Sequence, residues 1–247
     1  MTCREPRALL VTHLADEGAG AFPGWLGLDL DVHAAGAAAP TPATLDPAYD
    51  ALVVMGGAMG VPDVTTTHPW LGAELALLRD AVARGVPTLG VCLGAQLLAA
   101  ACGGSVERGR IGPELGLRRV HLTDAAEADP LLHGLPRVAP AVQWHFDEIV
   151  TLPPGATLLA SSPMYPHQAF RVGERAWGVQ FHPEAGPSMV ARWAREDAAA
   201  LDGAAPADVA AEVERAWPDL ERTWAPVARR FAAVVRETVH PYAEERR

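Results

Sequence analysis

A single cysteine lies at a sharp turn that the sequence predicts between a buried strand and a helix. Cys92 follows the apolar residues 86–91 and precedes an apolar stretch at 93–102. Gly90 and Gly94 flank it, and glycine lets a backbone bend tightly and approach its neighbours closely. This pattern is typical of a nucleophile elbow, in which a reactive side chain stands above the edge of a sheet.

The predicted helix start at Cys92 suits a reactive thiol. A helix N-terminus favours negative charge, and therefore favours a thiolate over a thiol. The N–H of Leu93 points into the same space and can stabilise a developing oxyanion. A second interpretation stays open, because cysteine is among the most buried residue types and often packs as a small hydrophobic residue.

A histidine and a glutamate in a second motif favour the catalytic interpretation. Residues 177–184 read Trp-Gly-Val-Gln-Phe-His-Pro-Glu, which predicts a strand running into a loop. Only Pro183 separates His182 from Glu184, so in an extended chain the two side chains point the same way. A thiol nucleophile needs a base, and the base needs a carboxylate to orient it and stabilise its cation. Cys92, His182 and Glu184 supply these three groups.

The elements that position these residues alternate between strands and helices in the first part of the chain. The patterns predict strands at 8–12, 28–33, 50–55 and 86–91, and helices at 19–26, 69–84 and 93–102. Such alternation is typical of a parallel sheet with helices on both faces. We therefore expect a three-layer, flavodoxin-like α/β fold. Its ligands should bind at the carboxyl ends of the strands, where Cys92 and the Gly56-Gly57 pair are predicted.

The second part of the chain predicts a partly antiparallel extension of the sheet and a helical C-terminal tail. Short strand candidates separated by turn residues lie at 105–108, 115–122, 142–149, 156–161, 168–172 and 176–181. Beyond them the sequence is charged, and helices are expected at 188–201, 207–217 and 220–240. We therefore expect one domain at residues 1–186 and a helical extension, residues 187–247, packed on or beside it.

The composition argues against several classes of protein. A net charge of −10 disfavours nucleic-acid binding through a basic surface. Cys3, Cys92 and Cys102 are too few and too unevenly placed for a disulfide framework, and suit the cytoplasm. No apolar run approaches the roughly twenty residues of a membrane span, and no signal-peptide layout is present. The histidines lack metal-ligand spacing. We expect no metal, cofactor, nucleic acid or membrane partner.

The two motifs together resemble those of the class I, triad-type glutamine amidotransferases. They read Gly90-Val-Cys92-Leu-Gly94-Ala-Gln96 and Gly178-Val-Gln-Phe-His182-Pro-Glu184. The resemblance covers about residues 6–186 and points to free-standing members that are similar to the amidotransferase domain of GMP synthase. Four further segments carry it: Met55-Gly-Gly-Ala-Met, Pro69-Trp-Leu, Gln143-Trp-His and Gln168-Ala-Phe-Arg.

This resemblance implies that residues 1–186 form an amidotransferase domain that hydrolyses the side-chain amide of glutamine through a thioester. Cys92 would attack the amide, His182 would carry the thiol proton to the leaving ammonia, and Glu184 would orient His182. The resemblance assigns further roles to the N–H groups of Gly57 and Leu93, as oxyanion donors, and to Gln96, His145 and Phe146, as contacts for glutamine.

The sequence departs from the family pattern at two positions. Ala58 follows the glycine pair where relatives often have proline, which leaves the N–H donors intact but loosens the loop. Phe146 stands where relatives often have glycine, and its bulk would narrow the pocket.

Three functions therefore remain open. The first is a glutaminase that supplies ammonia to a synthetase on a separate chain, because neither a P-loop nor a Ser-Gly-Gly-x-Asp-Ser loop for ATP is present. The second is a γ-glutamyl hydrolase, because a γ-glutamyl peptide or amide contains the same scissile bond. The third is a regulatory subunit without catalytic activity; the intact Cys92, His182 and Glu184 argue against it.

Overall fold

The structure is a computed structural model that describes residues 4–13, 18–36, 40–62 and 67–239. Cys3 and the last residues of the expected tail, 240–247, lie outside the described residues. The strands are β1 (Arg7–Thr12), β2 (Asp29–Ala34), β3 (Ala51–Val54), β4 (Thr88–Val91), β5 (Ser105–Arg108), β6 (Glu114–Leu122), β7 (Val138–His145), β8 (Asp147–Thr151), β9 (Thr157–Ser161), β10 (Ala169–Val172) and β11 (Ala176–Val179). The helices are α1 (Phe22–Leu26), α2 (Leu71–Ala83), α3 (Leu93–Ala101), α4 (Pro187–Glu196) and α5 (Pro206–Val239), with 3₁₀ helices η2 (Asp124–Ala128) and η3 (Ala198–Ala200).

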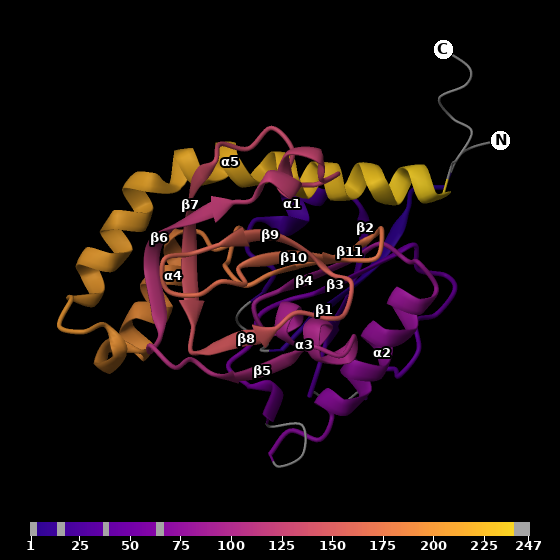
Figure 1. Cartoon of the computed structure of the whole chain (residues 1–247), viewed down its shortest axis with the longest axis horizontal. Coiled ribbons are helices and arrows are strands. Elements are labelled where there is room, and N and C mark those ends of the chain that lie inside the picture. The colour runs from indigo at the N-terminus through magenta and orange to yellow at the C-terminus, as the bar shows by residue number, and fades with distance from the viewer. Residues whose placement is uncertain (1–3, 14–17, 37–39, 63–66, 240–247) are drawn as a thin grey trace.

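A nine-stranded sheet in the order β2-β1-β3-β4-β11-β10-β9-β6-β7 forms the centre of the molecule (Figure 1). The pairs from β2 to β11 are parallel, and the pairs from β11 to β7 are antiparallel. The expected α/β fold with a partly antiparallel extension is therefore confirmed. Strand β4, which leads to Cys92, lies in the parallel half between β3 and β11.

Both faces of the parallel half are covered, which explains why its inner strands β1, β3 and β4 are buried at successive positions. In β1, Leu9 and Val11 belong to a core cluster that contains the inner faces of α2 and α3. Ala8 and Leu10 point to the other face and belong to a cluster that contains residues of α1, α4 and α5. Figure 1 shows α5 along one side of the sheet and α2 and α3 on the other. The three-layer arrangement is thus confirmed.

The chain changes sheets at Phe146, which the sequence does not predict. One strand is expected over 142–149, whereas the structure has β7 and β8 with Phe146 between them. Strand β7 pairs with β6 in the large sheet, and β8 pairs with β5 in a separate two-stranded sheet. The prediction of one strand is wrong because Phe146 is not a turn-forming residue, so no local signal marks the switch.

The C-terminal helix is longer than the sequence predicts. Separate helices are expected at 207–217 and 220–240, but α5 runs through both Pro218 and Pro226. Proline inside a helix removes a hydrogen bond and bends the helix, and Figure 1 shows α5 bending along its length. Its buried side, which includes Trp224, holds the helix against the sheet in spite of the prolines.

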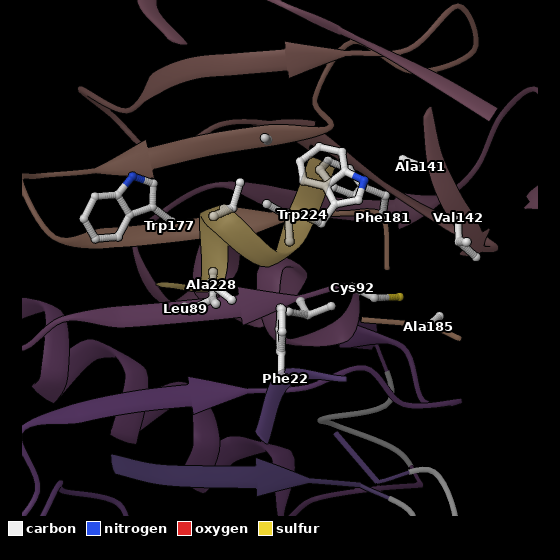
Figure 2. Packing of buried hydrophobic residues seen from close by; sticks show 14 of the residues in the cluster. Phe22, Leu89, Cys92, Ala141, Val142, Trp177, Phe181, Ala185, Trp224 and Ala228 are labelled. Atoms are coloured by element: carbon white, nitrogen blue, oxygen red, sulfur yellow. The ribbon is translucent and has the colours of Figure 1, made fainter. Parts of the chain in front are cut away.

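Residues of α5 pack into the same core as strands of the sheet. Figure 2 shows Trp224 of α5 beside Phe181, which follows β11. Their ring centroids are 4.7 Å apart, and the Trp224 indole N–H donates to the carbonyl of Pro140 at 2.8 Å. Fully burying an aromatic side chain contributes about 1.5–3 kcal/mol. The segment that carries the predicted histidine is therefore anchored to the C-terminal helix.

None of the helices in the described ranges combines the length and apolar character needed to cross a bilayer.

Gly94 allows α3 to approach β3 closely enough to place Cys92 at the sheet edge. A Cβ atom at this position would lie 2.0 Å from the carbonyl oxygen of Val54. We expect Gly94→Ala to lower the free energy of unfolding by about 1–3 kcal/mol or more, because backbone would have to move. Urea denaturation checks this against Gly24→Ala in α1, where a Cβ meets no atom within 4 Å. Equal stability of the two variants would contradict the prediction.

Candidate active site

Cys92 occupies a strained turn between β4 and α3. Its backbone has φ 50° and ψ −107°, a conformation that costs a non-glycine residue about 1–3 kcal/mol. Three hydrogen bonds hold it there. The Cys92 N–H donates to Val179 at 2.8 Å, the Gln96 N–H donates to Cys92 at 3.0 Å, and the Gly94 N–H donates to Met55 at 3.2 Å. This geometry is that of a nucleophile elbow.

Strand β11 brings His182 to Cys92 because it pairs in parallel with β4. Val91 and Val179 are register partners at the ends of the two strands, so the residues that follow them leave the sheet at the same edge. The His182 N–H donates to the carbonyl of Val142 in β7 at 2.8 Å. In Figure 2 the Cys92 sulfur points away from Leu89 of β4, and so away from that part of the core.

His182 and Glu184 form a buried pair beside Cys92. His182 Nδ1 lies 2.8 Å from Glu184 Oε1, and their side chains are 6% and 1% exposed. The remaining ring nitrogen is left for Cys92, whose side chain interacts with His182 and affects its pKa. The pair forms across a turn at Pro183 and not along an extended chain, which corrects the geometry expected from the sequence. The structure thus brings the three predicted catalytic residues together.

The electrostatics of the site favour a protonated histidine. Burial lowers the pKa of His182, but the charges of Glu184 and Cys92, with hydrogen bonds to both, raise that pKa well above its ordinary value. The raised pKa favours the imidazolium form at neutral pH. An imidazolium beside Cys92 stabilises a thiolate.

The raised pKa of His182 predicts a pH-dependent contribution to stability. Because the folded-state pKa lies above the unfolded value of about 6.5, His182 stabilises the fold fully below about pH 6.5. That contribution is lost as the pH rises through the folded-state pKa. We expect the difference in unfolding free energy between the wild type and His182→Asn to shrink from about pH 6 to about pH 9. Urea denaturation at both pH values measures it, and a constant or growing difference would contradict the expectation.

A pocket of about 490 Å³ opens in front of Cys92 and His182. The loop after β3, the end of β7 and helix α4 contribute to its walls. Besides the triad residues, four charged residues line it: Arg108, Asp147, Glu196 and Asp197. A pocket of this size lies within the range typical of small-molecule sites.

The two residues predicted to stabilise an oxyanion lie next to each other beside the elbow. Gly57 lines the pocket with Cys92, and a Cβ atom on Gly57 would lie 2.9 Å from Leu93 Cδ2. Leu93 begins α3, and N–H groups in the first turn of a helix have no acceptor within that helix. The two N–H groups are therefore positioned on adjacent backbone segments.

Gln96 lines the pocket, but its amide nitrogen already has protein partners. Its Nε2 donates to Gln180 Oε1 at 3.2 Å and to the carbonyl oxygen of Asp147 at 3.4 Å. Gln180 in turn approaches Cys92 Sγ with its own Nε2, at 3.8 Å. The side chains of Gln96 and Gln180 thus connect the elbow helix to the histidine motif.

His145 and Phe146 line the pocket where the chain leaves β7. The His145 ring is held inside the protein, with Nδ1 2.9 Å from the carbonyl oxygen of Asp147 and Nε2 3.3 Å from Glu114 Oε2. The Arg108 guanidinium lies 4.8 Å from the centre of the Phe146 ring. Phe146 and Arg108 therefore form part of the pocket wall, and the carbonyl oxygen of Trp144, one residue before His145, lies 3.8 Å from Cys92 Sγ.

Besides the charged residues of the pocket wall, two residues that contact the triad are absent from the sequence prediction. Trp193 of α4 packs on the His182 ring with a centroid distance of 4.8 Å, although α4 lies beyond the predicted domain boundary. Gln180 lies inside the histidine motif, between the buried strand and His182. This position is the one local signal in the sequence that marks it as a site residue. Trp193 carries no such signal: α4 begins at Pro187, shortly after the motif, but no local pattern indicates that it folds back onto the His182 ring. Within the described ranges, no group of three or more His, Cys, Asp or Glu side chains is arranged to hold a metal ion.

The sequence matches a family described as "Glutamine amidotransferase class-I" over residues 26–192. The A subunit of a glutamine-hydrolyzing GMP synthase from Thermococcus kodakarensis is 39% identical over 126 residues, which are 51% of this chain and 63% of the relative. A glutamine-hydrolyzing GMP synthase of Porphyromonas gingivalis is 44% identical over 112 residues, which are 45% of this chain and 21% of the relative. The matches thus span less than two thirds of these relatives.

Solved structures match the chain over nearly its whole length. A glutamine amidotransferase from Thermotoga maritima has a TM-score of 0.79 and 28% identity, covering 93% of this chain and 99% of that chain. A glutamine amido transferase from Methylobacillus flagellatus has a TM-score of 0.81 and 26% identity, covering 94% of this chain and 95% of that chain. These matches include the C-terminal helices as well as the sheet.

Proposed function

The chain belongs to the class I glutamine amidotransferase family, and we propose that it hydrolyses the side-chain amide of glutamine to glutamate and ammonia. One observation carries the proposal. Cys92 stands at a strained elbow beside a buried His182–Glu184 pair with a 2.8 Å contact, in a pocket large enough for a small amide. These groups are the nucleophile, base and orienting carboxylate that acyl transfer requires.

In the proposed first step, the Cys92 thiolate attacks the amide carbon and forms a carbon–sulfur bond. The carbonyl oxygen becomes an oxyanion that accepts hydrogen bonds from the N–H groups of Gly57 and Leu93. The His182 imidazolium gives its proton to the amide nitrogen as the carbon–nitrogen bond breaks, and ammonia leaves. The raised pKa of His182 supports this role, because the proton is present on the histidine at neutral pH.

In the proposed second step, water hydrolyses the γ-glutamyl thioester. Neutral His182 takes a proton from the water as the hydroxide oxygen bonds to the carbonyl carbon. The carbon–sulfur bond then breaks, glutamate leaves, and the Cys92 thiolate and His182 imidazolium are regenerated. Glu184 stays ionised throughout and stabilises the imidazolium. Gln96 and the backbone at His145 and Phe146 are proposed to hold the amino-acid end of the substrate.

We propose that the ammonia passes to a synthetase on a separate chain. The name of the Thermococcus kodakarensis relative, which is one subunit of a glutamine-hydrolyzing GMP synthase, supports a two-chain arrangement. The longer relative from Porphyromonas gingivalis is matched over only 21% of its length.

A free thiol at Cys92, which forms no disulfide among the described residues, suits a reducing compartment such as the cytoplasm.

We further propose that residues 187–247 are an extension that completes the site built by residues 1–186. Trp193 of α4 packs on His182, and the Trp144 indole N–H donates to Asp197 Oδ2 at 2.8 Å. The extension therefore contacts both the proposed base and the wall of the pocket.

Release of glutamate by the purified protein tests the proposal, with L-glutamine and γ-glutamylalanine compared side by side and Cys92→Ala as the blank. Preferred, Cys92-dependent turnover of glutamine supports the glutaminase. Preference for the dipeptide would replace it with a γ-glutamyl hydrolase, whose pocket must accept a larger leaving group beside Phe146. Turnover of neither substrate would contradict both, and would favour a regulatory protein.

A further inference from the structure

Another buried histidine–glutamate pair lies on the far side of the Gly56-Gly57 turn from the triad. His13, which follows β1, and Glu74 of α2 both have side chains with 0% exposure. His13 Nε2 lies 2.8 Å from Glu74 Oε2, and His13 Nδ1 lies 2.8 Å from the carbonyl oxygen of Gly56. Neither side chain takes part in the proposed reaction.

The protonation of His13 follows from its partners. A backbone carbonyl only accepts hydrogen bonds, so His13 Nδ1 carries a proton and donates it to Gly56. Glu74 holds the other ring nitrogen and thereby fixes the orientation of the imidazole, as carboxylates commonly do for functional histidines. Trp70 stacks beside the ring at a centroid distance of 6.0 Å. The Nδ1–H of His13 is thus a fixed donor.

The carbonyl that His13 holds belongs to the same peptide unit as the N–H of Gly57. A peptide unit is planar and trans, so its C=O and N–H point in opposite directions. Because the Gly56 oxygen points toward His13, the Gly57 N–H points away from His13. Gly57 lines the pocket with Cys92, which is where an oxyanion would form.

The turn has little freedom beyond this hydrogen bond. A Cβ atom on Gly57 would lie 2.8 Å from the Cβ of His13, and one on Gly56 would lie 2.7 Å from His182 Cε1. The two glycines are therefore enclosed between His13 on one side and His182 on the other. Rotation of their shared peptide would break the His13 contact and turn the Gly57 N–H out of the pocket.

We propose that His13, held by Glu74, is a positioning residue that fixes the Gly57 N–H as an oxyanion donor. The proposal rests on the proposed amide hydrolysis, since it gives this histidine–glutamate pair a task that differs from that of His182 and Glu184. His182 moves protons, whereas His13 keeps its proton and holds one peptide plane. Loss of a single oxyanion donor lowers kcat by about 10²–10³-fold.

Two variants that differ in where they place an amide nitrogen test the proposal. The side-chain nitrogen of asparagine lies near the position of histidine Nδ1, and that of glutamine lies near Nε2. His13→Asn therefore keeps a donor for Gly56, and His13→Gln loses it. Both are made with Glu74→Gln, so that neither variant buries an unpaired carboxylate.

We expect kcat for glutamine to be about 10- to 100-fold lower in His13→Gln/Glu74→Gln than in His13→Asn/Glu74→Gln. KM should agree within about twofold, because the missing contact forms mainly in the transition state. The rate of Cys92 alkylation by iodoacetamide should also agree, because that displacement forms no oxyanion. A merely structural role of His13 would change kcat and alkylation together.

Crystal structures of both double variants give a readout that does not depend on turnover. We expect the Gly56-Gly57 peptide to be rotated with glutamine at position 13 and unchanged with asparagine. Equal kcat values, a parallel loss of alkylation, or an unrotated peptide in the glutamine variant would overturn the inference. Absence of turnover in the wild type would instead overturn the proposed function, and the peptide orientation would then decide the inference by itself.

Discussion

Replacing Cys92 with alanine is expected to lower the turnover of glutamine by about 10⁴-fold or more, because no other group can form the thioester. The variant should remain folded. Cys92 is 6% exposed and packs in the core cluster, and alanine fills most of its volume while the hydrogen bonds to Val179 and Gln96 persist. Glutamate release measures the loss, and circular dichroism with urea denaturation measures the fold.

Cys102→Ala is the matched control, since it removes the other described thiol at the end of the same helix. Burial raises the pKa of the Cys102 thiol, which keeps it protonated and poorly nucleophilic. We expect this variant to retain full turnover. Retained activity in Cys92→Ala, or equal losses in both variants, would show that Cys92 is not the nucleophile.

Replacing Glu184 with glutamine is expected to have the second-largest effect, a loss of about 10³–10⁴-fold in kcat. Glutamine has nearly the same shape, so the packing is kept. It removes the charge 2.8 Å from His182 Nδ1 and allows an amide N–H to face that nitrogen, which favours the wrong tautomer. Glu127→Gln, which neutralises a carboxylate paired with Arg137 at the surface, is the control and should leave kcat unchanged.

The pH profile of Glu184→Gln gives an independent check. Because the charge of Glu184 raises the pKa of His182, its removal lowers that pKa. The imidazolium is then lost at a lower pH. The pH at which kcat/KM falls on the alkaline side of the profile should therefore be lower than in the wild type. An unshifted alkaline limb, or a kcat within about tenfold of the wild type, would contradict the assigned role.

The sequence predicts the triad well because its signals are local. An elbow cysteine between glycines marks the end of a buried strand, and His182 and Glu184 follow another strand with one residue between them. The parallel pairing of β4 and β11 then brings the two motifs together, as alternation of strands and helices predicts. The apolar runs of β1 and β3 likewise identify buried central strands without any tertiary information.

The rest of the site depends on contacts that no local pattern encodes. Glu74 lies on the buried face of α2 between Leu71 and Leu77. An ionisable residue at an apolar position of a helix can be recognised in the sequence, but the sequence does not indicate that His13 is its partner. The change of sheets at Phe146 and the packing of Trp193 on His182 are also set by tertiary structure. Long-range pairing, and not local propensity, decides these features.

Detection of the covalent intermediate tests the central proposal most directly. Wild-type protein is mixed with L-glutamine, quenched in acid within the turnover time, digested in acid with pepsin, which can cut at Leu97 and Leu98 between the two cysteines, and analysed by mass spectrometry. We expect one γ-glutamyl group on the peptide that contains Cys92, none on the peptide that contains Cys102, and none in Cys92→Ala. Turnover of glutamine without this adduct in the wild type, or an adduct on another residue, would contradict the thioester mechanism at Cys92.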